Sequence, residues 1–327
     1  MSIAARPRMV SPARLNPSYG RGTYTMEEQE DDGEAEQLRS WLERFLDTPA
    51  LVLPRPPTVA LEIYELSRRS DTDIGKIAQL LGREPMLAAS VLKLANSPLY
   101  RGDSPSATLK HALTRVGLAA ARDIVMEAAM RMTILRAEGM SQTLERIRRH
   151  STGVAWLSRA VARNTPLEAE HAFLVGLLHH IGLAVGLVGT AEYLRQRRLP
   201  VQLTASRWLT VDQLHPALGQ RVLESWGVGA PLAFTVGHHH TLMIEAHPHP
   251  GVAVLLVAQS LAADHGWHVS PVTEEDDPLG ECVGPATGDP FDTERALQAL
   301  NLTQRHYELL RKDAGPMLET LDTHFRA

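Results

Sequence analysis

The segment 174–188, LVGLLHHIGLAVGLV, constrains the fold of this chain more than any other part. Thirteen of its fifteen residues are apolar or glycine, and the two exceptions are His179 and His180. A helix that is apolar on all sides is normally buried at the centre of a domain. The segment is shorter than the ~20 apolar residues that cross a bilayer. The sequence therefore predicts a buried central helix, over 167–188, with two adjacent imidazoles that need hydrogen-bonding partners.

The composition indicates the fold class and argues against several classes of function. Apolar residues make up 44% of the chain and aromatic residues 5%, and segments with strand-like alternation are scarce, so we expect an all-α protein. The net charge of −5 argues against strong non-specific binding to nucleic acids. The single cysteine, Cys282, excludes an intrachain disulfide and a four-cysteine zinc site. The N-terminus lacks the apolar core of a signal peptide, and we expect a cytoplasmic protein.

Two polar segments predict disorder or flexibility. Residues 1–36 contain an arginine-rich stretch followed by the acidic run EEQEDDGEAE, so we expect a disordered leader with helix beginning near Glu36. Residues 267–291 are rich in proline, glycine and aspartate, and we expect a flexible loop there.

The segment 73–96 has the outline of a helix-turn-helix. Its second helix is largely apolar, which suits packing against protein rather than DNA reading.

Histidine is the residue type that could carry chemistry in this chain. His150 shares one predicted helix face with Ile147, Val154 and Leu157, so it points inward. Further histidines occur at 179–180, at 215 and in the run 238–240. Facing helices of a bundle can bring such side chains together into a metal site. The alternative is that His150 and His179 are neutral core imidazoles bonded to carbonyls or to each other, with the run 238–240 covering a helix end.

Five stretches resemble a known family. GLLHHIGLAV (176–185) resembles the GLLHDIGK signature of the HD superfamily of metal-dependent phosphohydrolases, and RRHSTGVAWLSRAVA (148–162), LHPALGQRVLESWG (214–227) and VGHHHT (236–241) resemble its other histidine motifs. The N-terminal half is more specific, because EPMLAASVLKLANSPLY (84–100) is similar to the core motif of the HDOD family, the HD-related output domain. The chain is thus identified as a member of the HDOD family, a degenerate branch of the HD superfamily.

The resemblance implies an all-α fold of two helical lobes and a regulatory role in bacterial signalling. We expect an N-terminal lobe over 37–137, an HD-like lobe over 138–266, and terminal helices over 292–327 that pack on the domain. In the N-terminal lobe the motif residues Asn96, Ser97 and Tyr100 are expected to act as structural anchors that shape the surface between the lobes.

The resemblance also shows where the chain departs from the active enzymes. The degenerate HD-type positions are His150, His179, His180, His215, His239 and Gln259. His180 replaces a metal-binding aspartate, and Gln259 replaces another. Hydrolytic sites need carboxylates beside imidazoles to hold metals that activate water. We therefore expect no catalytic residue, no bound metal and no cofactor, with a nitrogen-only zinc site as the alternative.

Three functions remain open at this point. The main prediction is a non-catalytic signalling protein that binds a protein partner, or a small ligand, in the groove between the lobes, without nucleic acid or membrane. The second is a residual HD-type metal-dependent phosphohydrolase or phosphodiesterase acting on a nucleotide or cyclic dinucleotide. The third is a DNA-binding regulator that uses residues 73–96.

Overall fold

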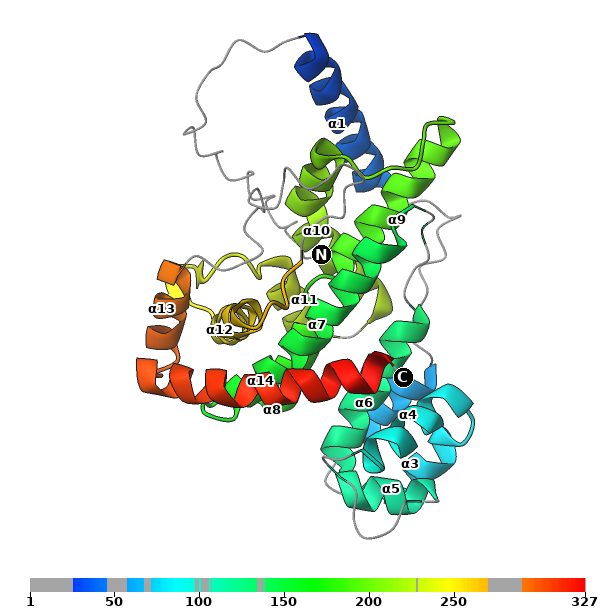
Figure 1. The fold of residues 1–327 in the computed structure, drawn as a ribbon, viewed down its shortest axis with the longest axis vertical. Helices are drawn as coiled ribbons and strands as arrows, with labels where there is room; N and C mark the ends of the chain where they lie inside the picture. Colours follow the sequence, from blue (N-terminus) through cyan, green and yellow to red (C-terminus); the bar gives the residue numbers. More distant parts are fainter. Residues whose placement is uncertain are drawn as a thin grey trace, which may run out of the picture.

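The computed structural model describes residues 26–45, 58–67, 72–97, 100, 106, 108–133, 137, 139–227, 229–269 and 290–326. In these ranges the chain forms fourteen helices and one short hairpin, so the predicted all-α class is confirmed. Figure 1 shows two helical lobes, a smaller N-terminal one and a larger one that contains the central helices. Residues 1–25 and 270–289 of the expected leader and loop lie outside the described residues, as does Cys282.

The N-terminal lobe contains α2 to α6. Their bounds are α2 Thr58–Ser67, α3 Ile74–Leu81, α4 Pro85–Ala95, α5 Leu109–Val116 and α6 Leu118–Thr133. Asp73 caps α3 by accepting a hydrogen bond from the Gly75 backbone N–H, and Thr108 caps α5 in the same manner. Leu87 and Val91 of α4 are completely buried. The second helix of the suspected helix-turn-helix thus uses one face to pack on its own lobe.

The larger lobe is built on α7 to α12. Their bounds are α7 Ser141–Ala162, α8 Ala169–Leu178, α9 Ile181–Gln196, α10 Ala205–Trp226, α11 Ala230–Gly237 and α12 Pro250–Asp264, with a hairpin of β1 Met243–Ile244 and β2 His247–Pro248 between the last two. α7 packs on α8 and α12, and α10 packs on α9 and α11. One continuous apolar core joins this lobe to the N-terminal lobe.

The predicted central helix is divided at the two histidines. α8 ends at Leu178 and α9 begins at Ile181, so His179 and His180 form the junction. The expectation of one helix over 167–188 is therefore wrong. Taken together, Ala169–Gln196 is long and apolar enough to span a membrane, but 94% of its most apolar window is buried inside the protein, which makes it weak evidence for a span.

The helix α10 continues through a proline, a residue that normally breaks a helix. The structure has one helix, Ala205–Trp226, with Pro216 inside it. Proline cannot donate a backbone hydrogen bond to the carbonyl four residues earlier. Here the ring N–H of His215 donates to that carbonyl, the one of Asp212, in its place. The helix therefore continues past the proline.

The N-terminal helix α1 corrects two expectations. It spans Met26–Phe45, so residues 26–36 are helical rather than a disordered leader, and it packs on α9 and α10 of the larger lobe rather than on the N-terminal lobe. Leu38 and Leu42 are completely buried there, and Glu34 forms an ion pair with Arg207 at 2.8 Å. Acidic residues also favour the N-terminal end of a helix. Leu38 and Leu42 thus supply apolar burial that the acidic run itself lacks.

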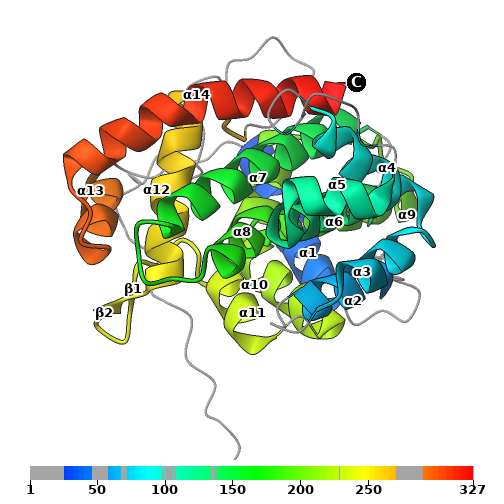
Figure 2. The same cartoon turned by 90° about the horizontal axis from the view of Figure 1, so that it is seen from below.

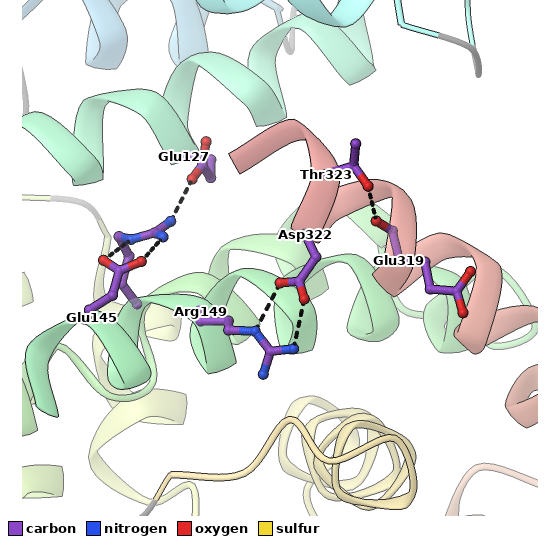
Figure 3. Close-up of polar contacts among 7 residues, drawn as sticks. Glu127, Glu145, Arg149, Glu319, Asp322 and Thr323 are labelled. Carbon is purple, nitrogen blue, oxygen red and sulfur yellow. Dashed lines mark hydrogen bonds and ion pairs between the residues drawn. The ribbon is translucent and has the colours of Figure 1, made fainter. Parts of the chain in front are cut away.

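The terminal helices α13, Pro290–Ala299, and α14, Gln304–Arg326, pack on the larger lobe through α12 and α7. Figure 2 shows α14 lying along the molecule from α13 to the N-terminal lobe. Trp267 and Val269 are buried, so the first residues of the expected loop 267–291 belong to the core. The guanidinium of Arg149 lies 3.9 Å above the Trp267 ring and also holds Asp322 of α14 at 2.9 and 3.0 Å (Figure 3).

Candidate functional site

Six histidines from four parts of the larger lobe meet at one place, and we call them the histidine cluster. His150 comes from α7, His179 and His180 from the α8–α9 junction, His215 from α10, and His239 and His240 from the residues after α11. Neighbouring rings lie between 3.8 and 5.7 Å apart, measured between their centroids. The structure thus brings together five of the six degenerate HD-type positions and adds His240.

The cluster is closed to solvent except at one member. His150, His179, His180, His215 and His239 are each exposed by 2% or less. His240 is exposed as a residue, but its Nε2 atom points inward to the Nε2 atom of His215 at 3.2 Å. The run 238–240 therefore does more than cover a helix end, because His239 is completely buried.

The backbone fixes the tautomer of four cluster members. The Nδ1 atoms of His150, His179 and His239 lie 2.6 to 2.7 Å from the carbonyls of Trp267, Gly176 and Val236, and the Nδ1 atom of His215 contacts the Asp212 carbonyl. A carbonyl can only accept, so each Nδ1 carries the proton and each Nε2 presents a lone pair. Gly176 and Val236 lie in the last turns of α8 and α11, where carbonyls lack partners within the helix.

The bare Nε2 atoms face one another. His179 and His150 approach to 3.3 Å between their Nε2 atoms, and His215 and His239 approach to 3.1 Å. With both Nδ1 atoms of a pair protonated, neither Nε2 of the neutral pair can donate to the other. The contacts therefore place lone pair against lone pair, an arrangement that a shared proton or a cation would relieve.

His180 has no hydrogen-bond partner at either ring nitrogen, although it is 1% exposed. Of the two adjacent imidazoles, only His179 has a backbone hydrogen-bond partner. An unpartnered buried polar group costs about 1–3 kcal/mol. His180 belongs to both of the groups whose ring nitrogens lie within 4.8 Å of one another, His150–His179–His180 and His180–His215–His239.

Burial keeps the cluster neutral near pH 7. It lowers the pKa of His150 to about 4, that of His215 to about 3 and that of His240 to about 4. The pKa values of the other three members are lowered well below 6.5, first by burial and then by neighbouring imidazoles. Burial also raises the pKa of Asp212, whose carboxylate lies 3.6 Å from Nδ1 of His215, to about 6. Since His215 is neutral, this contact is not an ion pair.

The donor set fits a metal that prefers nitrogen and does not fit a hydrolytic centre of the HD type. Within the described part of the chain, neither group of three contains a carboxylate. Gln259 is buried on α12, and none of the ring contacts above involves it. Imidazoles held by Nδ1–H bonds to carbonyls are the usual arrangement of metal-binding histidines. The sequence indicated the run 238–240, and His239 within it, but not that His240 rather than His238 joins the cluster.

Asn96 and Ser97 of the N-terminal motif lie at a second feature, a cavity of about 870 Å³ between α4, α6, α7 and α14. Asn96 links the end of α4 to the chain ahead of α5, because its side chain exchanges two hydrogen bonds with the Ser106 backbone at 2.7 and 3.2 Å. Ser97 and Trp156 line the cavity, and the Ser97 Oγ and Trp156 Nε1 atoms are buried without a hydrogen-bond partner. Tyr100 is half-buried against the core.

Comparison with solved structures identifies the fold. An HDOD domain protein of unknown function from Geobacter sulfurreducens matches with a TM-score of 0.62 and 20% identity, over 89% of this chain and 99% of that one. A protein described as a candidate metal-dependent phosphohydrolase from Shewanella amazonensis SB2B matches with a TM-score of 0.57 and 22% identity, over 82% and 99%. A candidate signal transduction protein from Marinobacter aquaeolei VT8 matches with a TM-score of 0.62 and 16% identity, over 90% and 65%.

Comparison by sequence identifies the family. An uncharacterised protein of Treponema pallidum (strain Nichols) is 22% identical over 197 residues, which are 58% of this chain. The chain spans only 38% of the length of that relative. The HDOD domain itself matches residues 53–242, more than half of the chain, and this range includes all six histidines of the cluster. The chain therefore belongs to the HDOD family.

Proposed function

We propose that this chain is a non-catalytic regulator of bacterial signalling, in the cytoplasm, that acts by binding a protein partner. One observation carries the non-catalytic half of the proposal. His180 of the buried cluster and the buried Gln259 of α12 occupy the two positions at which HD hydrolases are expected to hold carboxylates. Without carboxylates, a pair of metals that activates water has no oxygen ligands from this site.

The burial of the cluster supports the same conclusion. A phosphate ester must reach the metals to be hydrolysed, but five of the six imidazoles are exposed by 2% or less. Asp212 is an acid that lies beside the cluster. Its carboxylate is next to Nδ1 of His215, on the side of the ring that faces away from the other Nε2 atoms. Among the described residues, therefore, the imidazoles are closed to a substrate, and Asp212 does not face their centre.

The cavity beside α4 supports the binding half of the proposal. It lies where the N-terminal lobe meets α7 and α14, and ligand sites favour such boundaries between lobes. Leu94, Ile124 and Met317 give the cavity apolar lining that a partner side chain or a small ligand can cover. Lys93 stands exposed at the rim, so a charge change there would alter recognition without disturbing the core.

The second candidate is a phosphohydrolase, favoured by the likeness of the fold to the Shewanella amazonensis SB2B protein. Purified protein with Mn²⁺ or Mg²⁺ and bis-p-nitrophenyl phosphate separates the two. We expect no turnover above that of His179→Ala. Turnover that this substitution abolishes would establish the hydrolase and refute the regulator as stated.

Partner binding needs a separate test with a matched pair of variants. Lys93→Glu reverses the charge at the cavity rim, and Lys76→Glu makes the same change on the exposed side of α3. We expect the unmodified chain and Lys76→Glu to enrich the same protein from the native organism, and Lys93→Glu to lose it. Equal enrichment by both variants would exclude the cavity as the binding place.

A further inference from the structure

We infer that the histidine cluster is a binding site for one divalent ion of the zinc class, held by imidazole nitrogens alone with His180 as the shared ligand. This inference does not rest on the proposed regulatory function, because a structural ion is compatible with either candidate function. It concerns the arrangement of donors in this chain, which differs from a carboxylate-containing HD centre at His180 and Gln259.

The spacing of the donors is the first argument. Zinc binds imidazole nitrogen at about 2.0–2.1 Å with tetrahedral geometry, which puts neighbouring ligand nitrogens about 3.3–3.4 Å apart. The Nε2 atoms of His179 and His150 are 3.3 Å apart, those of His215 and His239 are 3.1 Å apart, and those of His240 and His215 are 3.2 Å apart. Two of these pairs, His150–His179 and His215–His239, therefore already place lone-pair atoms at nearly the separation of ligands on one ion. The backbone does not fix the tautomer of His240, so its Nε2 atom can donate to His215 instead.

The state of the ring nitrogens is the second argument. Backbone carbonyls hold the Nδ1 protons of His150, His179, His215 and His239, so their four Nε2 atoms present lone pairs to one another. Among the contacts of the cluster, only the Nε2 atom of His240 can donate to one of them, that of His215. The carbonyl–imidazole bond is also what orients metal-binding histidines and raises their basicity. A cation between the Nε2 atoms would replace repulsion by coordination.

The third argument is His180, which is buried and has no partner at either nitrogen. Any single ion in this region can reach His180, because it belongs to both groups of three. Two ions would have to share it a few Å apart. Two divalent charges at that distance repel each other strongly, and neither group contains a carboxylate to reduce the repulsion. The geometry therefore favours one ion per chain.

The chemistry of the donors selects the class of ion. Neutral imidazoles suit Zn²⁺, Cu²⁺ and Ni²⁺, whereas Mg²⁺, Ca²⁺ and Mn²⁺ require oxygen ligands. Both groups of three consist of imidazoles alone, as far as the described residues show. We commit to Zn²⁺, because it accepts the tetrahedral angles that 3.1–3.3 Å separations imply.

The direct experiment is a titration of the demetallated full chain with Zn²⁺ against a chelating indicator. We expect one equivalent to bind, Mg²⁺ not to compete, and His180→Ala to weaken binding by at least about 100-fold. His238→Ala is the matched control, since His238 bonds to the Phe234 carbonyl and stacks on the Phe234 ring instead of joining the cluster. Binding retained in His180→Ala but lost in His238→Ala would place the ion on the surface and overturn the inference.

A second measurement avoids the risk that a cluster variant fails to fold. Co²⁺ added to the unmodified, demetallated chain should give the intense visible absorption of a tetrahedral nitrogen site, and one equivalent of Zn²⁺ should remove it. Weak absorption typical of octahedral Co²⁺, or none, would refute the inference even if zinc bound elsewhere. The partner-capture experiment above is independent of this result, so failure of the zinc site and failure of the regulatory proposal are distinguishable.

Discussion

Gly182, in the first turn of α9, offers the sharpest test of how the cluster is assembled. A methyl group added at this residue would lie 2.6 Å from the backbone nitrogen of Gly219 and closer still to the carbonyl oxygen of His215, both in α10. Real Cβ atoms essentially never come within 3.0 Å of such atoms. Both obstacles belong to the backbone, so no side chain can rotate away. The substitution Gly182→Ala must therefore separate α9 from α10.

The magnitude follows from two opposing terms. Overpacking of a filled core costs about 1–3 kcal/mol, occasionally more, and a contact with backbone on the opposite side belongs to the upper part of that range. Replacing glycine by alanine within a helix returns at most about 1 kcal/mol. We expect Gly182→Ala to lower the free energy of unfolding by about 2 kcal/mol, and to move His215 relative to His180.

Thermal unfolding followed by circular dichroism measures this effect. A loss of about 2 kcal/mol lowers Tm by roughly 4–8 °C for a domain of this size class. Gly33→Ala is the control, because a Cβ at that helical and exposed residue of α1 meets nothing within 4 Å, so Tm should stay level or rise. If Gly182→Ala melts at or above the temperature of the unmodified chain, the close crossing of α9 and α10 is not as described.

Three further outcomes are expected. Burial lowers the pKa of His150 to about 4, so below pH 6.5 the unfolded chain binds more protons than the folded chain. The contribution of His150 to the free energy of unfolding is therefore complete above pH 6.5 and falls by about 3 kcal/mol towards pH 4. Denaturant unfolding of the metal-free chain at a series of pH values would measure this loss. Asp123→Asn should destabilise the chain by about 3 kcal/mol in the same assay, because it leaves the buried guanidinium of Arg159 without its carboxylate partner. Asp322→Asn removes the paired bonds to the partly exposed Arg149; we expect under about 1 kcal/mol of global destabilisation but faster hydrogen exchange in α14, and unchanged exchange there would contradict the contact.

The helical fold was predictable because its periodic apolar faces are long. The face containing Ile147, His150 and Val154 is buried as expected. The helix ends were less predictable. Nothing in LVGLLHHIGLAVGLV is a helix breaker at His179–His180, and the continuity of α10 depends on a ring N–H that replaces the bond missing at Pro216. Both depend on tertiary contacts that local periodicity does not encode.

The residue types of the site were predictable from the sequence, but the direction of each imidazole lone pair was not. The family motifs indicated five histidines, and the structure brings all five together. The direction of each lone pair could not be predicted, because it depends on which carbonyl each Nδ1 meets, and the Trp267 carbonyl comes from a segment expected to be a loop. The position of α1 was missed for a similar reason, since its burial depends on distant partners such as Trp208 rather than on its own acidic sequence.

The single exposed member of the cluster has a consequence for rates rather than for affinity. Five imidazoles are closed off, and His240 alone connects the surface to His215. Any ion or proton that exchanges with the interior must either pass His240 or wait for local opening of the lobe, which is far slower than diffusion. Substituting His240 by a bulky apolar residue should therefore slow both loading and release while leaving the equilibrium little changed. The cluster would then retain an ion that it bound during folding, and would respond only slowly to changes in the concentration of that ion.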